Sequence, residues 1–273
     1  MTRVTGYRRV KCPQCDQIYL TTLFSSVNYL DHQIWSDGYA YYRMGDNTSN
    51  ILMCSCGALL MRNQMGLCAD VRRENHTEII EPEGTFWTRI AKSMRYARPT
   101  SPPSLEAETD GPREAEDFPH LRQIAVPDSA MGQLLTQRAW NGTVDMEMQV
   151  NRRHLYHLLA DYRATLSRRV SNAVDGGRSI PDMPYYDSSL FLPTPDYLDH
   201  TARTLNLWLA NRPEDWSFIA DMQRQLGRFD ASSTTVHDRE INRDARVEAR
   251  GLMVHALAQK GIQAPALLSY GGF

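Results

Sequence analysis

The spacing of hydrophobic positions changes near the middle of the chain. Before about residue 98, apolar residues form short stretches with the β-branched and aromatic content typical of strands. From about residue 129 they recur every three or four positions, the spacing that places them on one face of a helix. The pattern predicts an α+β protein, a small β-rich module followed by an α-helical bundle. The expected strands cover residues 17–23, 39–44, 50–53 and 58–61.

Residues that cap or break helices divide the second half into about five helices. Thr143 and Thr194 are expected to cap helices, with Pro195 at the first helical position. Gly227 and Gly261 can adopt the left-handed conformation that ends a helix. The expected helices run from Ser129 to the stop at Asn141-Gly142, from Thr143 to about Asn172, from Pro195 to about Asn211, from Pro213 to Leu226 and from about Arg239 to Lys260.

Composition divides the chain into three parts. Residues 1–98 form the β-rich module, and residues 99–128 are rich in proline and acidic side chains, as in a linker. Residues 129–273 form the helical domain. Within it, the loop at 176–195 carries Tyr185, Tyr186 and Phe191 and is long enough to have a functional role.

Charge and hydropathy exclude some classes of function. With 30 basic and 32 acidic residues among 273, the net charge is −2, which gives no general attraction to phosphate and argues against a histone-like role. No apolar run approaches the roughly 20 residues that cross a bilayer, and the first residues do not form a signal peptide. We therefore expect a cytoplasmic protein with no membrane partner.

Cysteines are confined to the first 68 residues, where four of the five form two short pairs. Cys12 and Cys15 are separated by two residues, and Cys54 and Cys56 by one. Two such hooks present four thiolates to a single ion in a zinc ribbon. Because a site with four cysteine ligands has no open coordination position, the Zn²⁺ ion is expected to be structural.

The second hook is one residue shorter than usual, which leaves alternatives for the ligand set. Either Cys54 and Cys56 both reach the metal through a tighter turn, or one of them is not a ligand. Cys68 and His32 are the residues that could take its place.

These motifs resemble those of a group of uncharacterised bacterial zinc-ribbon proteins with a C-terminal helical, tetratricopeptide-like region. In that group the second hook usually has two residues between its cysteines, so Met53 stands where a cysteine is expected and Cys54 is displaced. The resemblance implies the fold and a metal site but no activity. It is carried by Cys12–Cys15, Ile34–Gly38 and Cys54–Leu59, and further along by Arg152–Tyr156 and Arg224–Asp230.

One helix carries titratable side chains on a shared face. His154, His157 and Asp161 follow one another at spacings of three and four residues, which suits a second metal or acid–base chemistry. Nearby arginines favour a solvated face instead. Arg168 and Arg169 form a small basic edge that could contact a phosphate or an acidic partner.

Tyrosines follow the Trp-Ser-Asp-Gly stretch and suggest a nucleic-acid surface. Bases could stack on exposed tyrosines beside cationic side chains. Alternating tyrosines in a strand are also typical of a small module that covers its own metal hook, which is the favoured interpretation. The residues concerned are Tyr39, Tyr41 and Tyr42, with Arg8, Arg9, Lys11 and Arg43.

The sequence lacks the motifs of nucleotide hydrolysis, nicotinamide chemistry, serine hydrolases and zinc proteolysis. We therefore predict a non-enzymatic zinc-binding protein that acts as a protein–protein interaction module and binds another protein through its helical part. Two alternatives are a nucleic-acid-binding regulator that uses the zinc ribbon and an immunity or antitoxin-type protein. A third is an enzyme with an unfamiliar site around His154, His157 and Asp161.

Overall fold

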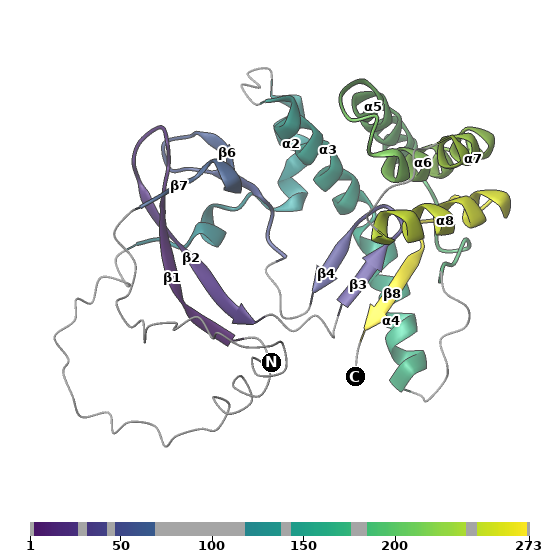
Figure 1. Cartoon of the computed structure of the whole chain (residues 1–273), viewed down its shortest axis with the longest axis horizontal. Coiled ribbons are helices and arrows are strands. Elements are labelled where there is room, and N and C mark those ends of the chain that lie inside the picture. Colours follow the sequence, from purple (N-terminus) through teal and green to yellow (C-terminus); the bar gives the residue numbers. More distant parts are fainter. Residues whose placement is uncertain are drawn as a thin grey trace, which may run out of the picture.

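The computed structural model describes residues 3–26, 32–42, 47–68, 118–137, 143–175, 185–238 and 245–271. Arg43, the first part of the expected linker, residues 176–184 of the loop and the start of the last expected helix lie outside these ranges. The described chain forms two lobes (Figure 1). The strands are β1 (Arg3–Lys11), β2 (Ile18–Ser26), β3 (His32–Trp35), β4 (Ala40–Tyr42), β5 (Ile51–Met53), β6 (Leu59–Met61), β7 (Gly66–Leu67) and β8 (Leu267–Gly271).

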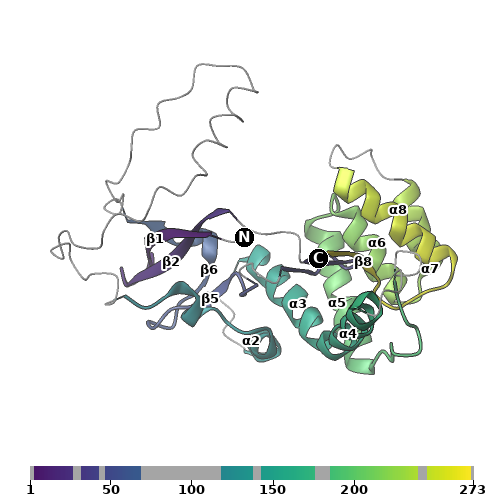
Figure 2. The ribbon, with the colours of Figure 1, turned by 90° about the horizontal axis from the view of Figure 1, so that it is seen from below.

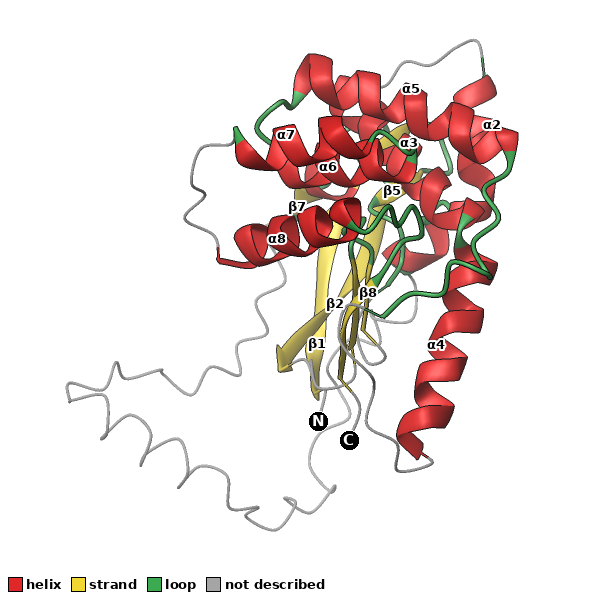
Figure 3. Cartoon of the chain, turned by 90° about the vertical axis from the view of Figure 1, so that its right-hand side faces the viewer, coloured by secondary structure: helices red, strands yellow, loops and turns green. Residues whose placement is uncertain are grey.

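The helices are α2 (Met131–Thr136), α3 (Val144–Leu158), α4 (Ala160–Asp175), α5 (Pro195–Asn211), α6 (Trp216–Gln225), α7 (Phe229–His237) and α8 (Ala245–Gln259). The described residues therefore contain both small antiparallel sheets and helices, as predicted. In Figure 3, α5, α6 and α7 lie together at one end of the strands, and α4 runs alongside the strands. No helix in the described parts of the chain combines the length and apolar character that a membrane crossing requires.

The first lobe contains all five cysteines, and we call it the cysteine module. Strand β1 pairs with β2 and β7, and β5 pairs with β6 in a separate hairpin. Both hooks lie at the tips of these hairpins, because Lys11 pairs with Ile18 and Met53 pairs with Leu59. Its core contains Tyr19 and Leu52 together with the side chains of Cys12 and Cys54.

Residues 118–128 pack on the cysteine module, although composition assigns them to a linker. The Leu20 N–H donates to the Pro119 carbonyl at 2.9 Å, and the Val126 N–H donates to the Ile51 carbonyl at 2.8 Å. Leu121 is buried in the same core as Cys12. Unlike the acidic part of the sequence before it, this stretch contains apolar side chains. The free energy gained by burying these side chains outweighs the entropy lost when the stretch is ordered.

A central sheet joins the early and late parts of the chain. Strand β3 pairs with β4 on one side and with β8 on the other, with His32 opposite Gly271. Residues expected in the N-terminal module thus share a sheet with the C-terminal strand, and the expected boundary at residue 98 does not follow this sheet. Trp35 at the end of β3 is fully buried against Tyr162 and Leu166 of α4.

The described residues form seven α-helices where about five were expected. The helix predicted from Thr143 onward is divided at Leu159, whose backbone (φ −100°, ψ 4°) separates α3 from α4. Helix α7 was missed because its pattern is weak: only Ser232 and Val236 of its residues are buried. Ser129 lies in a 3-10 turn, and α2 begins two residues later.

The capping residues behave as predicted. The Thr143 hydroxyl accepts a hydrogen bond from the Met146 N–H, and the Thr194 hydroxyl accepts one from the Tyr197 N–H. Gly227 ends α6 with φ 74°. The apolar stripe expected on the helix after Thr143 is also largely correct. It comprises Leu155, Leu158, Leu159, Tyr162, Leu166 and Val170. All of these side chains are buried except Leu158, which is half-buried.

Helices α2 and α3 connect the two lobes (Figure 2). Ile51 of the cysteine module packs in one cluster with Met131 of α2 and with Met146 and Val150 of α3. Farther along α3, Leu155 belongs to the core around Trp35. The module is therefore held against the helical lobe by apolar contacts.

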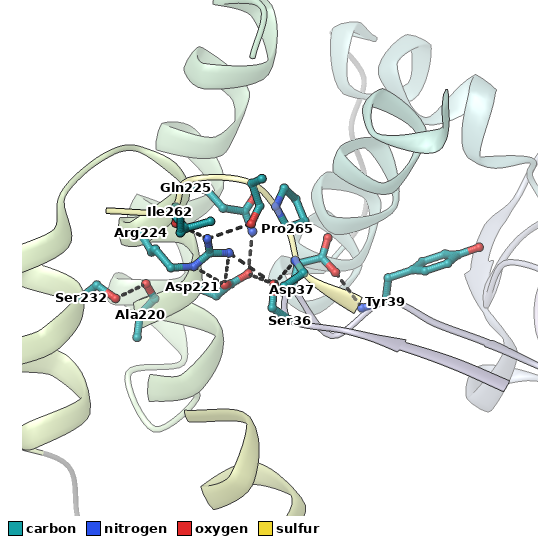
Figure 4. A network of polar contacts seen from close by, with 12 residues as sticks. Ser36, Asp37, Tyr39, Ala220, Asp221, Arg224, Gln225, Ser232, Ile262 and Pro265 are labelled. Atoms are coloured by element: carbon teal, nitrogen blue, oxygen red, sulfur yellow. Dashed lines mark hydrogen bonds and ion pairs between the residues drawn. The ribbon is translucent and has the colours of Figure 1, made fainter. Parts of the chain in front are cut away.

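The turn that joins β3 to β4 carries a buried polar network (Figure 4). Asp221 and Arg224 of α6 form an ion pair in which both side chains are 0% exposed. Arg224 also donates to the Ala264 carbonyl at 2.9 Å and to the Ser36 hydroxyl at 3.3 Å. The Asp37 carboxylate pairs with Arg163 of α4. The Trp-Ser-Asp-Gly stretch thus anchors the central sheet to the helices rather than supporting the cysteine hooks.

Candidate metal centre

Both cysteine hooks are closed by backbone hydrogen bonds. In the first, the Cys12 N–H donates to the Gln17 carbonyl at 2.9 Å and the Asp16 N–H donates to the Cys12 carbonyl at 3.0 Å. In the second, the Cys54 N–H donates to the Ala58 carbonyl at 2.9 Å and the Gly57 N–H donates to the Cys54 carbonyl at 2.8 Å. The second hook therefore makes the same closure with one residue fewer.

A left-handed residue follows the second cysteine of each hook. Asp16 has φ 58° and Gly57 has φ 85°. This conformation, which glycine adopts without strain, reverses the chain directly after Cys15 and Cys56. The short spacing of the second hook is thus matched by a tighter turn, which was the first of the two alternatives derived from the sequence.

The four cysteines of the two hooks come together at one point. Their sulfur atoms all lie within 4.8 Å of one another. The Cys15 and Cys54 sulfurs are 3.5 Å apart, and all five cysteines of the chain are free thiols. These are the four residues predicted as ligands, including Cys54, whose role was open.

The spacing of the sulfur atoms suits a metal ion. Four sulfurs bound tetrahedrally at about 2.3 Å from one ion lie about 3.8 Å from each other. One sulfur–sulfur distance is 3.5 Å and none exceeds 4.8 Å, so coordination requires only small side-chain movements. Cys12 and Cys54 are buried while Cys15 and Cys56 are exposed, so the group lies at the surface end of the module's core.

Hydrogen-bond donors surround the sulfurs. The Gln14 N–H donates to the Cys12 sulfur at 3.4 Å, and the Tyr19 hydroxyl lies 3.1 Å from the Cys54 sulfur. Tyr19 is held in place because it accepts from the Ser55 N–H at 3.3 Å. Such donors orient thiolate ligands and disperse their negative charge.

The same donors shift the acidity of the thiols. Burial raises the pKa of Cys54, but the Cys56 N–H, the Tyr19 hydroxyl and the neighbouring thiols together lower that pKa to about 6. At Cys15 the Gln17 N–H lowers the pKa, while burial and the three other cysteines raise it to about 12. The arrangement therefore favours the thiolate form at Cys54 and the thiol form at Cys15. A bound cation would replace the proton of that thiol.

The two substitute ligands lie elsewhere. His32 Nε2 is 3.0 Å from the Ser269 hydroxyl in the central sheet. Cys68 donates its N–H to the Arg9 carbonyl and is not part of the cysteine group.

The second cluster expected from the sequence does not form a ligand group. The His154 ring packs edge-on against His200 with ring centroids 4.6 Å apart, while the His157 ring is 6.4 Å away. His157 and Asp161 are exposed. Across the described ranges, only the cysteine group brings three or more metal-ligating residues together.

The tyrosines in the β3–β4 turn and in β4 lie in different environments. Tyr39 packs edge-on against Tyr156 at 5.0 Å and lies under the Arg163 guanidinium, so it is not free to stack on a base. Tyr41 is exposed, and Arg43 lies outside the described residues. At the basic edge of α4, Arg169 pairs with Asp187 and Arg168 is exposed.

A cavity of about 280 Å³ lies beside the loop that the sequence singled out. Its walls come from the junction of α3 and α4, from residues 190–194 and from Tyr197 of α5. Phe191 is buried in one wall, whereas Leu192 is 82% exposed. We call this feature the loop cavity. The sequence singled out the loop as a functional candidate but could not show which helices it faces.

His200 gives a prediction for the pH dependence of stability. Burial, the nearby His154 and Arg203 lower its pKa to about 4. Because the unfolded residue titrates near 6.5, the unfolded chain takes up this proton first as the pH falls. The contribution of His200 to the free energy of unfolding should therefore be fully present above pH 6.5. Below that pH the contribution should decrease, by about 1–2 kcal/mol at pH 5.

Urea unfolding at pH 7.5, 6 and 5 tests this expectation. His200→Gln should show a smaller loss of stability between pH 7.5 and pH 5 than the wild type. His237→Gln, at an exposed histidine on α7, is the matched control and should keep the wild-type slope. Equal slopes for all three proteins would contradict the assignment to His200.

Comparison of the chain with protein-family profiles, with curated proteins and with solved structures finds no match in any of the three. The resemblance to bacterial zinc-ribbon proteins therefore stays a prediction. The geometry itself shows a group of four cysteines that could hold a metal ion.

Proposed function

We propose that Cys12, Cys15, Cys54 and Cys56 bind one structural Zn²⁺ ion and that the cysteine module is a zinc ribbon. The observation that carries this proposal is the convergence of four sulfurs from two hairpin tips. A donor set made only of thiolates favours zinc over the oxygen-seeking cations. With four protein ligands the ion has no open position, which supports a non-enzymatic role.

We further propose that the protein binds another protein at the loop cavity. Its walls include Leu159, Phe191 and other apolar side chains, and the exposed Leu192 stands beside them. Asp161 supplies a carboxylate at the same place. These features suit an extended segment of a partner that carries an apolar side chain next to a basic one.

Metal analysis tests the first proposal. Protein purified without added metal should contain one zinc per chain, and Co²⁺ in its place should give the absorption bands of tetrahedral thiolate coordination. Cys56→Ser should lower the zinc content, whereas Cys68→Ser, outside the group, should retain one ion. Well under one ion per chain in the wild type would refute the proposal.

Site-specific crosslinking tests the second. A photoreactive residue at 192 should give one protein adduct that maps to a single segment of the partner, while one at the exposed Leu209 of α5 should not. A peptide of that segment should bind the wild type and lose at least tenfold in affinity on Thr165→Arg, a wall residue. Recovery of nucleic acid alone, or equal crosslinking at both positions, would contradict a protein partner.

A further inference from the structure

Four arginine side chains surround the Ser36–Gly38 turn of the central sheet. Two of them are balanced by carboxylates, because Arg163 pairs with Asp37 and Arg224 pairs with Asp221. The other two, Arg152 of α3 and Arg250 of α8, have no carboxylate partner among the described residues. Two positive charges at one place thus have no ion-pair partner of their own, and Arg250 feels the carboxylates of Asp221 and Asp37 only at longer range.

Arg152 and Arg250 meet at Gly38. A Cβ on Gly38 would lie 2.5 Å from Arg152 Nη2 and 2.8 Å from Arg250 Nη1, so both nitrogens approach the same point. Gly38 has φ 77°, and glycine supplies both this conformation and the space for the two guanidinium groups. The two arginines therefore present adjacent N–H donors on one side of the turn.

Both guanidinium groups are held in place by neutral neighbours. Arg152 donates to the Gly38 carbonyl at 3.2 Å and stacks over the Phe218 ring, with its Cζ 4.9 Å from the ring centroid. Arg250 donates to the Ser217 hydroxyl through Nη2. Its Nε is buried and has no hydrogen-bond partner in the described structure. Both side chains are half-buried, so water compensates their charges only in part.

Ser217 of α6 adds a third polar group here. It is the second residue of this helix. Because the Ser217 oxygen accepts from Arg250, its own O–H is available as a donor. Two guanidinium groups and a hydroxyl together match the charge and the several acceptor oxygens of a phosphate.

We propose that Arg152, Arg250 and Ser217 bind a phosphate dianion, either inorganic phosphate or the phosphate of a small organic monoester. The site is separate from the cysteine group and from the loop cavity, and it does not depend on the proposed function. Its occupation would join α3, α6 and α8 through one ligand.

Ligand-dependent unfolding tests the site in the full-length protein. Sodium phosphate should raise the melting temperature more than sodium chloride at the same ionic strength. Arg250→Gln should lower the affinity for phosphate at least tenfold, measured by calorimetry, whereas Arg168→Gln at the exposed edge of α4 should bind as the wild type does. Phosphate that stabilises no more than chloride, or equally in Arg250→Gln, would overturn the proposal.

The order of melting temperatures separates binding from a purely structural role. Without phosphate, Arg250→Gln should melt no lower than the wild type, because the repulsion with Arg152 is relieved. With phosphate the wild type should melt higher. A variant that melts lower by the same amount in both buffers would show that Arg250 only supports packing.

A second arm distinguishes the two sources of phosphate. AMP that binds at least tenfold more tightly than inorganic phosphate, with the same loss in Arg250→Gln, would identify an organic monoester as the ligand. Equal affinities would identify inorganic phosphate. An oligonucleotide that binds with a steep salt dependence while neither small anion binds would overturn the proposal in favour of a nucleic-acid surface.

Discussion

Removal of the metal by a chelator is expected to unfold the cysteine module while the helical lobe stays folded. The core of the module is small, and two of its buried side chains, Cys12 and Cys54, belong to the proposed ligand set. Zinc binding contributes about 10–16 kcal/mol in small thiolate sites, more than a core of this size supplies. Without the ion, no ligand bonds join the two hairpin tips.

Hydrogen exchange measured by mass spectrometry can locate this effect. After chelation, amides of β1, β2, β5 and β6 should lose protection, whereas those of α5 and α6 should keep it. Cys12→Ser should reproduce the loss, and Cys68→Ser should not. Unchanged protection in the two hairpins after the metal is removed would show that the module folds without it.

The hooks were the most predictable feature of the molecule. A cysteine pair on a tight turn is a local property, and residues 12–17 and 54–58 each contain the residues that close their own turn. The helix caps at Thr143 and Thr194 were predictable for the same reason. The short second hook could not be judged from spacing alone, because its outcome depended on the left-handed conformation of Gly57.

Long-range pairing was not predictable from local patterns. Strand β8 contains only five residues, and its partner β3 lies more than two hundred positions earlier. Nothing in either segment specifies the other until Trp35 and Leu267 are buried in a common core. The same applies to Ser36 and Asp37, which look like ordinary turn residues in the sequence but lie among buried arginines in the structure.

Arg224→Met is expected to destabilise the helical lobe by about 3–5 kcal/mol, because it leaves a buried carboxylate without its partner. Asp221 and Arg224 are both 0% exposed, so water cannot replace the lost interaction. The substitution also removes the donor to the Ala264 carbonyl, which holds the segment before β8. The loss should be visible as a lower urea midpoint and as faster hydrogen exchange in β8.

An exposed ion pair provides the matched control. Arg212→Met breaks a pair with Asp145 in which the side chains are 46% and 57% exposed, and it should cost less than about 1 kcal/mol. Replacing Asp221 by Leu in the Arg224→Met background should restore part of the stability, because no buried charge then remains unpaired. The restoration stays partial, since Gln225 and Ser36 lose their hydrogen-bond partners in the network. If Arg224→Met costs no more than Arg212→Met, the network around the Ser36–Gly38 turn does not hold the central sheet to the helices.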